Sequence, residues 1–521
     1  MYKKQTHPIK EFEDSPGNLI SNSTQSILMR RRGSGCKEMK LRIQAGQFYD
    51  YERCKHRVYL DRYGNSNEKT SESPFLRLLW ERGIQHEARV ISKLSSEREI
   101  AHVEAPTEED AFARTLALMT QGVDLIYQGI LRTPDGIGRP DLLEKTAGPS
   151  RWGDYHYVPI DIKSGGGFEN PQTRERVKKE YAHQVIFYLD LLEEIQGYRP
   201  RVAKVINAAG EEITFAVSAY EETYSAARKD IEEIVRAGKS YEPVLGGKCK
   251  LCPWLQHCSD WVKEHDDLSQ IYWLGEGKYD FHARGIRTVE DMRGIHIANF
   301  MRPENRIPRI AEKTLSAYKR RARVLKEGKP LIHGPITFPK RSLEIFFDIE
   351  DDPTQDVVYL YGLWERPQGE VPRFRYFLAE KPQEQEAAFE ALMEYLSRLD
   401  DFVIYHYGPH ELTTLRKLCQ ASGNHRPVLE KFHRSAVDVF RVIEKHTDWP
   451  LYSYGLKDIA TFLGFRWSVE DASGANSIAW YAEYLKDPQR NRRFLERIVQ
   501  YNREDCESLA LVRDRLTAGI S

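Results

Sequence analysis

Residues 138–165 read GRPDLLEKTAGPSRWGDYHYVPIDIKSG. The apolar residues around Asp141 and Asp161 predict two short strands, and the Thr-Ala-Gly-Pro-Ser cluster between them predicts their connection. Asp161 and Lys163 are two residues apart, so on a strand both side chains project from the same face. An aspartate from each strand can hold a divalent cation, which leaves the Lys163 ammonium beside a phosphate. The alternative is an ordinary hairpin with a surface ion pair.

The size and composition of the chain indicate a soluble protein of several domains. Its 521 residues allow two or three domains, and 40% of the residues are hydrophobic while 30% are charged. No apolar run approaches the roughly 18 residues that span a membrane. The polar, basic start lacks the apolar segment of a signal peptide, so we expect a cytoplasmic protein without membrane contact. The net charge of −1 excludes a uniformly basic nucleic-acid binder but permits a basic groove beside acidic metal sites.

The pattern along the chain predicts four segments. Residues 1–40 lack periodicity and predict a disordered tail. A first α/β domain follows at 41–265, with amphipathic helices at 74–94 and 174–195. Residues 266–340 predict a helical linker that weakly resembles a helix-hairpin-helix. The strand SLEIFFDIE (342–350) opens a second α/β domain at 341–521.

The two predicted helices of the first domain carry further candidate site residues. Gly83, His86 and Glu87 fall within the segment 74–94, and His86 is suited to be a neutral metal ligand. A single histidine on a helix is also common as a packing or surface residue. Gln184 and Tyr188 are four residues apart, so they share a helical face and can hydrogen bond to a phosphate or a water molecule. Such pairs also occur on helices without an active site.

The order of these short motifs is G-x-x-H-E, P-D, D-x-K and Q-x-x-x-Y. This succession resembles the RecB-type branch of the PD-(D/E)XK nuclease superfamily. The resemblance implies a restriction-endonuclease-like fold in which Mg²⁺ or Mn²⁺ is bound by His86, Asp141 and Asp161. It also implies that Lys163 assists the attacking water or stabilises charge on the phosphorus, and that Gln184 and Tyr188 complete the site.

A cysteine cluster closes the first domain. Cys249, Cys252 and Cys258 are spaced C-x2-C-x5-C, and three thiolates need a fourth ligand, for which Cys54 is the natural candidate. One early and three late cysteines resemble the iron–sulfur site of the AddB nuclease and of CRISPR-associated RecB-type exonucleases. The resemblance implies a 4Fe–4S cluster that ties the two ends of the domain together. Zinc is the alternative, with His257 able to replace a thiolate. The cysteines read as ordinary thiols are Cys36, Cys419 and Cys506.

The last third of the chain carries a second set of carboxylates. Asp348 and Glu350 lie on one face of the apolar strand, and Tyr501 and Asp505 share a helical face. This pattern resembles the DEDD-type 3′–5′ exonucleases of the RNase H-like fold, in the variant that uses tyrosine. The stretch YSYGLKDIATFLGF (452–465) resembles the helix that precedes their last motif. The resemblance implies that two cations are held by Asp348, Glu350, Glu411 and Asp505, with Tyr501 holding the attacking water.

Electrostatics supports cations at this second set. Two carboxylates about 4 Å apart repel by about 4 kcal/mol at an effective dielectric constant of about 20, and two bound cations remove that repulsion. Glu411 departs from the aspartate of the family, and its side chain is longer by about 1.5 Å. A displacement of about 1 Å can cost a hundredfold in rate. Asp438 is the fallback ligand, although its position predicts the start of a helix. The alternative is a set of strand-end and surface residues.

The whole chain resembles the prokaryotic RecB-like nuclease family that joins both domains in one polypeptide. The resemblance implies a metal-dependent nuclease that acts on DNA, single-stranded or with free ends, or on RNA, in repair, recombination or defence, with a helicase or repair protein as an unidentified partner. The alternative is a nucleic-acid-binding scaffold in which one site, most readily the RNase H-like one, is inactive. A basic run that could contact phosphates, or form a solvated helix face, comprises Lys319, Arg320, Arg321 and Arg323.

Overall fold

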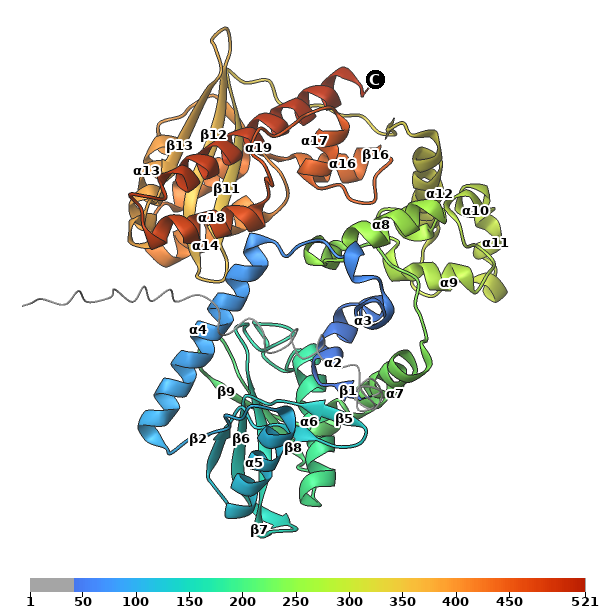
Figure 1. Ribbon diagram of the computed structural model, residues 1–521. Helices are drawn as coiled ribbons and strands as arrows, with labels where there is room; N and C mark the ends of the chain where they lie inside the picture. The colour runs from blue at the N-terminus through green and yellow to red at the C-terminus, as the bar shows by residue number, and fades with distance from the viewer. Residues whose placement is uncertain (1–41, 521) are drawn as a thin grey trace, which may run out of the picture.

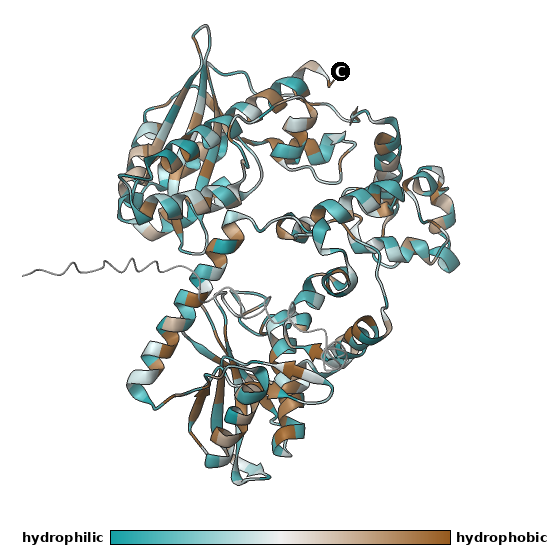
Figure 2. Ribbon diagram, viewed as in Figure 1, coloured by the Kyte–Doolittle hydropathy of each residue, from teal (hydrophilic) through white to brown (hydrophobic). Residues whose placement is uncertain are grey.

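The computed structural model describes residues 42–520. The tail predicted at 1–40, including Cys36, lies outside the described residues. Two α/β domains lie at opposite ends of the molecule, and a group of short helices lies beside them (Figure 1). Apolar residues concentrate in the strands and in the helices that cover them (Figure 2). No helix in the described part of the chain is long and apolar enough to cross a membrane.

A six-stranded mixed sheet forms the centre of the first domain. Its strand order is β2-β3-β6-β7-β8-β9, with β6 and β7 paired as an antiparallel hairpin and β7 parallel to β8. The strands are β2 (Ala101–His102), β3 (Leu125–Tyr127), β6 (Leu142–Ser150), β7 (Gly153–Ile162), β8 (Val202–Ile206) and β9 (Glu212–Ala216). The other elements of this domain are β1 (Ile43–Gln44), α2 (Gly46–Arg53), α3 (Lys55–Tyr63), α4 (Pro74–Glu97), α5 (Glu108–Gln121), β4 (Leu131–Arg132), β5 (Gly136–Gly138), α6 (Lys179–Gln196) and α7 (Glu221–Ala237).

The hairpin predicted around Asp141 and Asp161 is present, but its turn is not where the sequence predicts it. The residues Thr146 to Ser150 belong to β6, and the chain reverses at Arg151 and Trp152. Ser150 still pairs with Gly153, after a shift of register that begins at Ala147. The predicted connection was therefore wrong, because an irregular ladder accommodates turn-forming residues near the end of a hairpin.

Alternating residues of this hairpin are buried on opposite faces of the sheet. Leu142 and Ile160 pack with Val90 and Ile91 of α4. Leu143, in contrast, belongs to the core that contains the buried face of α6. Because side chains alternate along a strand, Asp161 points to the face opposite Ile160, which is the α6 side of the sheet. The two-sided burial therefore directs this aspartate toward α6.

The two helices predicted in the first domain are present. Helix α4 begins at Pro74 with Ser73 as its N-cap, because the Ser73 Oγ accepts the N–H of Leu76 at 3.2 Å. Helix α6 begins only at Lys179, so the predicted start at residue 174 was wrong. Arg174 has a φ of 52°, and Phe168 and Val177 form an antiparallel bridge. These conformations exclude a helix before Lys178.

The segment between the two domains is helical, as predicted, and has a core of its own. Asp291 and Thr288 form a capping box at the start of α10 (Val289–Gly294). The resemblance to a helix-hairpin-helix stays a prediction. The helices are α8 (Leu255–Glu264), α9 (Lys278–His282), α10 (Val289–Gly294), α11 (Ile297–Phe300) and α12 (Glu312–Glu327).

A five-stranded sheet of order β13-β12-β11-β14-β15 forms the second domain. Its central strand β11 is buried on both faces: Phe347 packs toward α13, whereas Phe346 packs with the core that includes α19. The strands are β11 (Leu343–Asp352), β12 (Val357–Pro367), β13 (Arg373–Leu378), β14 (Phe402–His406) and β15 (Ala436–Asp438), with β10 (Leu331–Ile332) paired to β16 (Thr447–Asp448) outside this sheet. The helices are α13 (Gln385–Ser397), α14 (His410–Ser422), α15 (Arg426–Ser435), α16 (Val439–His446), α17 (Leu456–Phe462), α18 (Gly474–Lys486) and α19 (Arg492–Ala518).

Helix α4 connects the two domains, as Figure 1 shows. Leu78, near its start, packs against Ile478 and Ala479 of α18. One turn later, the Arg82 guanidinium lies 2.7 Å from the carboxylate of Asp352, at the end of β11. The same helix therefore contributes to the first domain and to the interface with the second.

The basic run of α12 forms contacts within the chain. Arg320 and Arg321 both pair with the buried carboxylate of Asp448 in β16, and the Lys319 ammonium donates to the carbonyl oxygen of Ile295. Arg323 is 56% exposed and pairs with Glu327 one turn away. Contact of this run with phosphates stays a prediction, but two of its four charges already anchor the linker to the second domain.

The substitution Arg321→Met is expected to destabilise this junction. It removes one of the two guanidinium groups that balance Asp448, whose side chain is 1% exposed, and should cost about 2 kcal/mol. Arg323→Met is the matched control and should change the stability by less than about 0.5 kcal/mol. Thermal unfolding followed by calorimetry measures both changes. Equal shifts of the midpoint for the two variants would contradict this role of Arg321.

Candidate functional sites

The motif residues of the first domain converge at the end of the hairpin. Asp141 directly precedes β6, and its Oδ2 accepts the backbone N–H of Ile162 at 2.6 Å. Asp161 lies in β7, and its Oδ2 is 2.8 Å from the Lys163 ammonium. The sequence thus correctly places Asp161 and Lys163 on one face, and the hairpin brings Asp141 beside them.

Helix α6 continues this arrangement as a chain of hydrogen bonds. The Lys163 ammonium donates to Gln184 Oε1 at 2.9 Å, and Gln184 Nε2 donates to the Tyr188 hydroxyl at 3.1 Å. The Tyr188 hydroxyl in turn donates to the carbonyl oxygen of Arg139 at 3.3 Å. The i,i+4 pair on α6 therefore orients the lysine, which is a function that the spacing alone does not reveal.

Burial and neighbouring charge control protonation at this site. Burial raises the pKa of Asp141 well above its usual value, and the negative charges of Asp161 and Glu87 raise it further. Although burial opposes the charged form of Lys163, the two aspartates raise the pKa of Lys163. Burial, with the same two carboxylates, raises the pKa of Tyr188 well above its usual value, so its hydroxyl remains protonated. Such a site favours the binding of a cation.

Glu87 lies beside Asp141, although the sequence analysis gives it no role of its own. Its Oε1 accepts hydrogen bonds from the Tyr127 hydroxyl at 2.8 Å and from Gln128 Nε2 at 2.7 Å, and the same Gln128 nitrogen is 3.3 Å from Asp141 Oδ1. Gln128 has a φ of 57°, a strained conformation that the surrounding contacts must hold. The available signal was the His86–Glu87 dipeptide, of which the sequence analysis chose only the histidine.

His86 is buried, and burial lowers its pKa, so its imidazole is neutral. Its Nε2 has no hydrogen-bond partner among the described residues. His86 does not join Asp141 and Asp161 in any group of three ligand atoms within 4.8 Å of one another in the described chain. Its assignment as a metal ligand therefore stays a prediction.

The second domain gathers its carboxylates more tightly. Asp348 and Glu350 of β11 and Asp505 of α19 each offer an oxygen within 4.8 Å of the others. Burial raises the pKa of Asp348 well above its usual value, and the charges of Glu350 and Asp505 add to the increase. Burial, followed by the charge of Asp505, raises the pKa of Glu350 to about 8. These three carboxylates form the clearest candidate cation site in the described chain.

Polar residues that the sequence analysis does not select hold these carboxylates in place. Asn502 is completely buried, and its Nδ2 donates to Asp348 Oδ2 at 2.7 Å. The indole N–H of Trp467 donates to Asp505 Oδ1 at 2.7 Å, and the Ser477 hydroxyl, which hydrogen bonds to that of Tyr359 at 2.8 Å, opposes the increase in the pKa of Glu350. Asn502 follows Tyr501 within the Y-x3-D motif, but the motif leaves this position unspecified, and Trp467 and Ser477 come from other parts of the chain.

Tyr501 lies beside the three carboxylates, as its spacing predicts. Its hydroxyl opposes the increase in the pKa of Asp505, which burial causes. Burial raises the pKa of Tyr501 well above its usual value, and the charges of Asp505 and Glu350 raise it further. The phenol therefore remains protonated and can donate a hydrogen bond.

The predicted fourth carboxylate lies outside this group. Glu411 is buried in the first turn of α14, and its Oε2 lies 3.5 Å from His406 Nδ1. Its charge nevertheless acts on Asp348 and raises the pKa of that residue. Asp438 caps α16, because its Oδ1 accepts the N–H groups of Gly408 and Arg441. This confirms that Asp438 starts a helix, whereas the role of Glu411 as a ligand stays a prediction.

The four cysteines of the predicted cluster come together from two ends of the first domain. Cys54 separates α2 from α3, whereas Cys249 and Cys252 lie in the segment that leads into α8 and Cys258 lies in the first turn of α8. Burial raises the pKa of Cys258 to about 12, and the other three thiols add to the increase. His257 Nδ1 instead pairs with Glu68 at 2.5 Å. The donors that lie near one another are therefore the four thiols.

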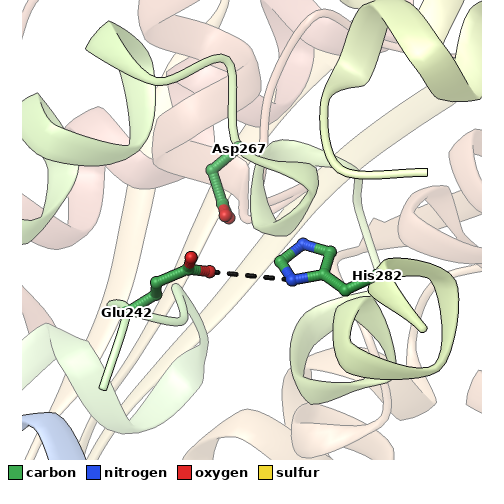
Figure 3. Close-up of side chains that lie close together, drawn as sticks. All are labelled: Glu242, Asp267 and His282. Atoms are coloured by element: carbon green, nitrogen blue, oxygen red, sulfur yellow. Dashed lines mark ion pairs between the residues drawn. The ribbon is translucent and has the colours of Figure 1, made fainter. Parts of the chain in front are cut away.

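A third group of potential ligands comprises Glu242, Asp267 and His282, and Figure 3 shows their side chains facing one another. The His282 Nδ1 is 3.8 Å from Glu242. The fully buried ammonium of Lys278 lies 2.7 Å from Asp267 and 3.3 Å from Glu242, and it also donates to the carbonyl oxygen of Pro243. Because Lys278 already supplies the positive charge, this group is an ion-pair network that joins the linker to the first domain.

Comparison with known families assigns both domains. The model of the PD-(D/E)XK nuclease superfamily matches residues 49–259, and the model of the RNase_H superfamily matches residues 345–517. The chain therefore joins a PD-(D/E)XK nuclease domain to a domain of the RNase H superfamily, which confirms the predicted fold class and architecture. No curated protein matches the chain.

The substitution Glu350→Gln is expected to stabilise the metal-free protein in a pH-dependent way. The unfolded chain releases this proton near pH 4.5, whereas the folded chain holds it until about pH 8. The wild type therefore loses stability as the pH rises between these values, and the glutamine variant does not. In EDTA the free energy of unfolding of the variant should exceed that of the wild type only slightly at pH 4.5, and by about 2–4 kcal/mol at pH 8. Thermal unfolding across this pH range measures it.

Glu365, a buried glutamate whose pKa is lowered instead of raised, provides the control. Although burial opposes its ionisation, hydrogen bonds from Arg375 and Tyr395 lower the pKa of Glu365. Glu365→Gln should therefore destabilise the protein at pH 8. The gain in stability from Glu350→Gln would not be electrostatic in origin if it did not vary with pH. The same conclusion would follow if Glu350→Gln and Glu365→Gln changed the stability in the same direction.

Proposed function

We propose that the protein is a metal-dependent nuclease with two active sites, one in each domain, that hydrolyses phosphodiester bonds of DNA or RNA. The observation that carries this proposal is the convergence of Asp348, Glu350 and Asp505 within 4.8 Å. Bound divalent cations would offset the free-energy cost of burying these mutually repelling carboxylates. Carboxylate oxygens are suitable ligands for such cations. The membership of both domains in nuclease-containing superfamilies supports the same function.

In the first domain, we assign Asp141 and Asp161 as ligands of Mg²⁺ or Mn²⁺, with His86 and Glu87 as the candidates on α4. The cation would activate water and neutralise charge on the phosphate. Lys163 is held by Asp161 and Gln184 and carries a positive charge toward the substrate phosphate. The chain of hydrogen bonds through α6 restricts the lysine to one orientation, which favours catalysis.

In the second domain, Asp348, Glu350 and Asp505 are the proposed ligands, and the Tyr501 hydroxyl orients the attacking water. The protonated state of Tyr501 suits this role, because the phenol can hydrogen bond to a water molecule without competing for a cation. The resemblance to tyrosine-containing DEDD exonucleases favours cleavage from a free end. DNA with single strands or free ends is the proposed substrate, in repair, recombination or defence and with a helicase or repair partner.

One observation favours a second function for this domain. Glu411 pairs with His406 instead of joining the three carboxylates. If this arrangement persists with metal bound, the RNase H-like domain binds and positions nucleic acid while the first domain cuts. Both alternatives predict that Asp161 is essential for at least part of the activity.

A nuclease assay on end-labelled single- and double-stranded DNA and RNA tests the proposal. Wild type, Asp161→Ala, Asp348→Ala and the double variant are compared with Mg²⁺ or Mn²⁺. Each single change should reduce a different set of products at least a hundredfold, since it removes a metal ligand. Loss of all cleavage in Asp161→Ala alone would assign the second domain to binding. Equal activity of wild type and double variant would overturn the nuclease assignment.

We also propose that Cys54, Cys249, Cys252 and Cys258 bind a 4Fe–4S cluster. In a zinc site the four sulfur atoms would lie about 3.8 Å apart, as tetrahedral geometry with Zn–S bonds of about 2.3 Å requires. No three of these sulfur atoms lie within 4.8 Å of one another in the described chain. This wider spacing favours a larger cluster. A cofactor here would hold α2 and α3 against the segment before α8.

Protein purified without oxygen tests the cofactor. It should be brown, absorb in the visible range near 400 nm, and contain about four iron atoms per chain. Cys252→Ser should lose most of this iron, whereas Cys419→Ser, in which a buried thiol of the other domain changes, should keep it. One equivalent of zinc in place of iron would establish the zinc alternative.

A further inference from the structure

Lys457 lies beside the carboxylates of the second domain without pairing directly with any of them. It occupies the start of α17, and its ammonium donates to the carbonyl oxygen of Ala472 at 2.6 Å. The same nitrogen is 4.2 Å from the centre of the Tyr501 ring and 5.0 Å from that of Trp467. The lysine is therefore fixed by one hydrogen bond and two aromatic faces.

The charge of Lys457 acts on the whole carboxylate group. It opposes the increase in the pKa of Asp348, of Glu350 and of Asp505. Burial lowers the pKa of Lys457, and the negative charge of Glu504 is among those that oppose this decrease. Glu504 itself accepts hydrogen bonds from the N–H and the hydroxyl of Ser468. The lysine thus contributes one positive charge to a site with three clustered carboxyl groups.

This arrangement differs from that of the first domain. There, the Lys163 ammonium contacts an Asp161 oxygen directly at 2.8 Å and covers it. In the second domain, the bond to Ala472 holds the ammonium away from the carboxylate oxygens, which stay available as ligands. A charge at this distance reduces the negative potential of the site without occupying a coordination position.

We propose that Lys457 is a positioning residue of the second active site, whose fixed positive charge weakens metal binding and whose contact with Tyr501 holds the tyrosine in place. This proposal rests on the proposed metal-dependent function of that site. Trp467 connects both effects, because it contacts the lysine through its ring and donates its N–H to Asp505. Lys457 therefore couples the position of the tyrosine to the charge at the cation site.

The test compares Lys457→Met with Lys457→Arg in the Asp161→Ala background, where the first site lacks a ligand. Lys457→Met removes the charge but keeps most of the side-chain volume, and Lys457→Arg retains the charge. The matched control is Lys431→Met. The Lys431 ammonium also lies over an aromatic ring, that of Phe402 at 5.6 Å, and donates to the carbonyl oxygen of Ser397 at 3.0 Å.

Two measurements separate a positioning role from a structural one. Calorimetric titration with Mn²⁺, using Asp161→Ala/Asp348→Ala protein as the blank, gives the metal affinity. Lys457→Met should bind Mn²⁺ roughly five- to tenfold more tightly, because the site becomes more negative. At saturating Mn²⁺ its turnover of single-stranded DNA should fall at least tenfold with KM changed less than about threefold, because Tyr501 loses its contact. Lys457→Arg should remain within about threefold of the parent in both measurements.

The opposite results would overturn the proposal. Unchanged or weaker Mn²⁺ binding by Lys457→Met, in protein that unfolds at the parent temperature, would show that the charge does not control the site. Equal effects of Lys457→Met and Lys431→Met on Mn²⁺ affinity and on turnover would show that Lys457 contributes to the stability of the fold and not to the active site. If neither parent nor variant cuts any substrate, the nuclease function of this domain fails, while the Mn²⁺ titration still decides the effect of Lys457 on metal affinity.

Discussion

Electrostatic repulsion between buried carboxylates is the constraint around which both domains are arranged. Each domain places acidic side chains at the centre of a sheet, where burial makes their charged forms costly. In the first domain Asp141 and Asp161 face each other across a hairpin, and in the second Asp348, Glu350 and Asp505 converge from a strand and a helix. The fold alone does not remove this repulsion. It is the property that makes cation binding favourable at both sites.

The two domains reduce the repulsion in different ways. The first uses a direct ion pair, with Lys163 held by Asp161 and by Gln184 of α6. The second uses a neutral amide, Asn502, whose place depends on a neighbouring glycine. A Cβ atom at Gly362 of β12 would lie 1.6 Å from the Asn502 side-chain oxygen. Only glycine at this strand position leaves room for the amide that donates to the carboxylates.

Helix α4 links the two carboxylate sites mechanically. Its middle carries Glu87, which shares Gln128 with Asp141, and its first turns pack on α18. Helix α18 in turn supplies the hydroxyl of Ser477, which opposes the increase in the pKa of Glu350. The contact of Arg82 with Asp352 fixes the same helix to the strand that carries Glu350. A displacement of α4 would therefore affect residues of both sites.

The sequence by itself determined the fold class, the order of the domains and most of the acidic residues, because local spacing decides which side chains share a face. Asp161 with Lys163, and Gln184 with Tyr188, are such pairs, and both face their site. Local composition failed at the hairpin turn and at the start of α6, where the pairing of Ser150 with Gly153 and of Phe168 with Val177 overrides the preference of single residues. Only the tertiary structure decided which residues hold the carboxylates and where Glu411 lies. Asn502 and Lys457 stand within the quoted motifs, but which carboxylate each of them and Trp467 reaches depends on how α17, α19 and the loop after α17 pack together.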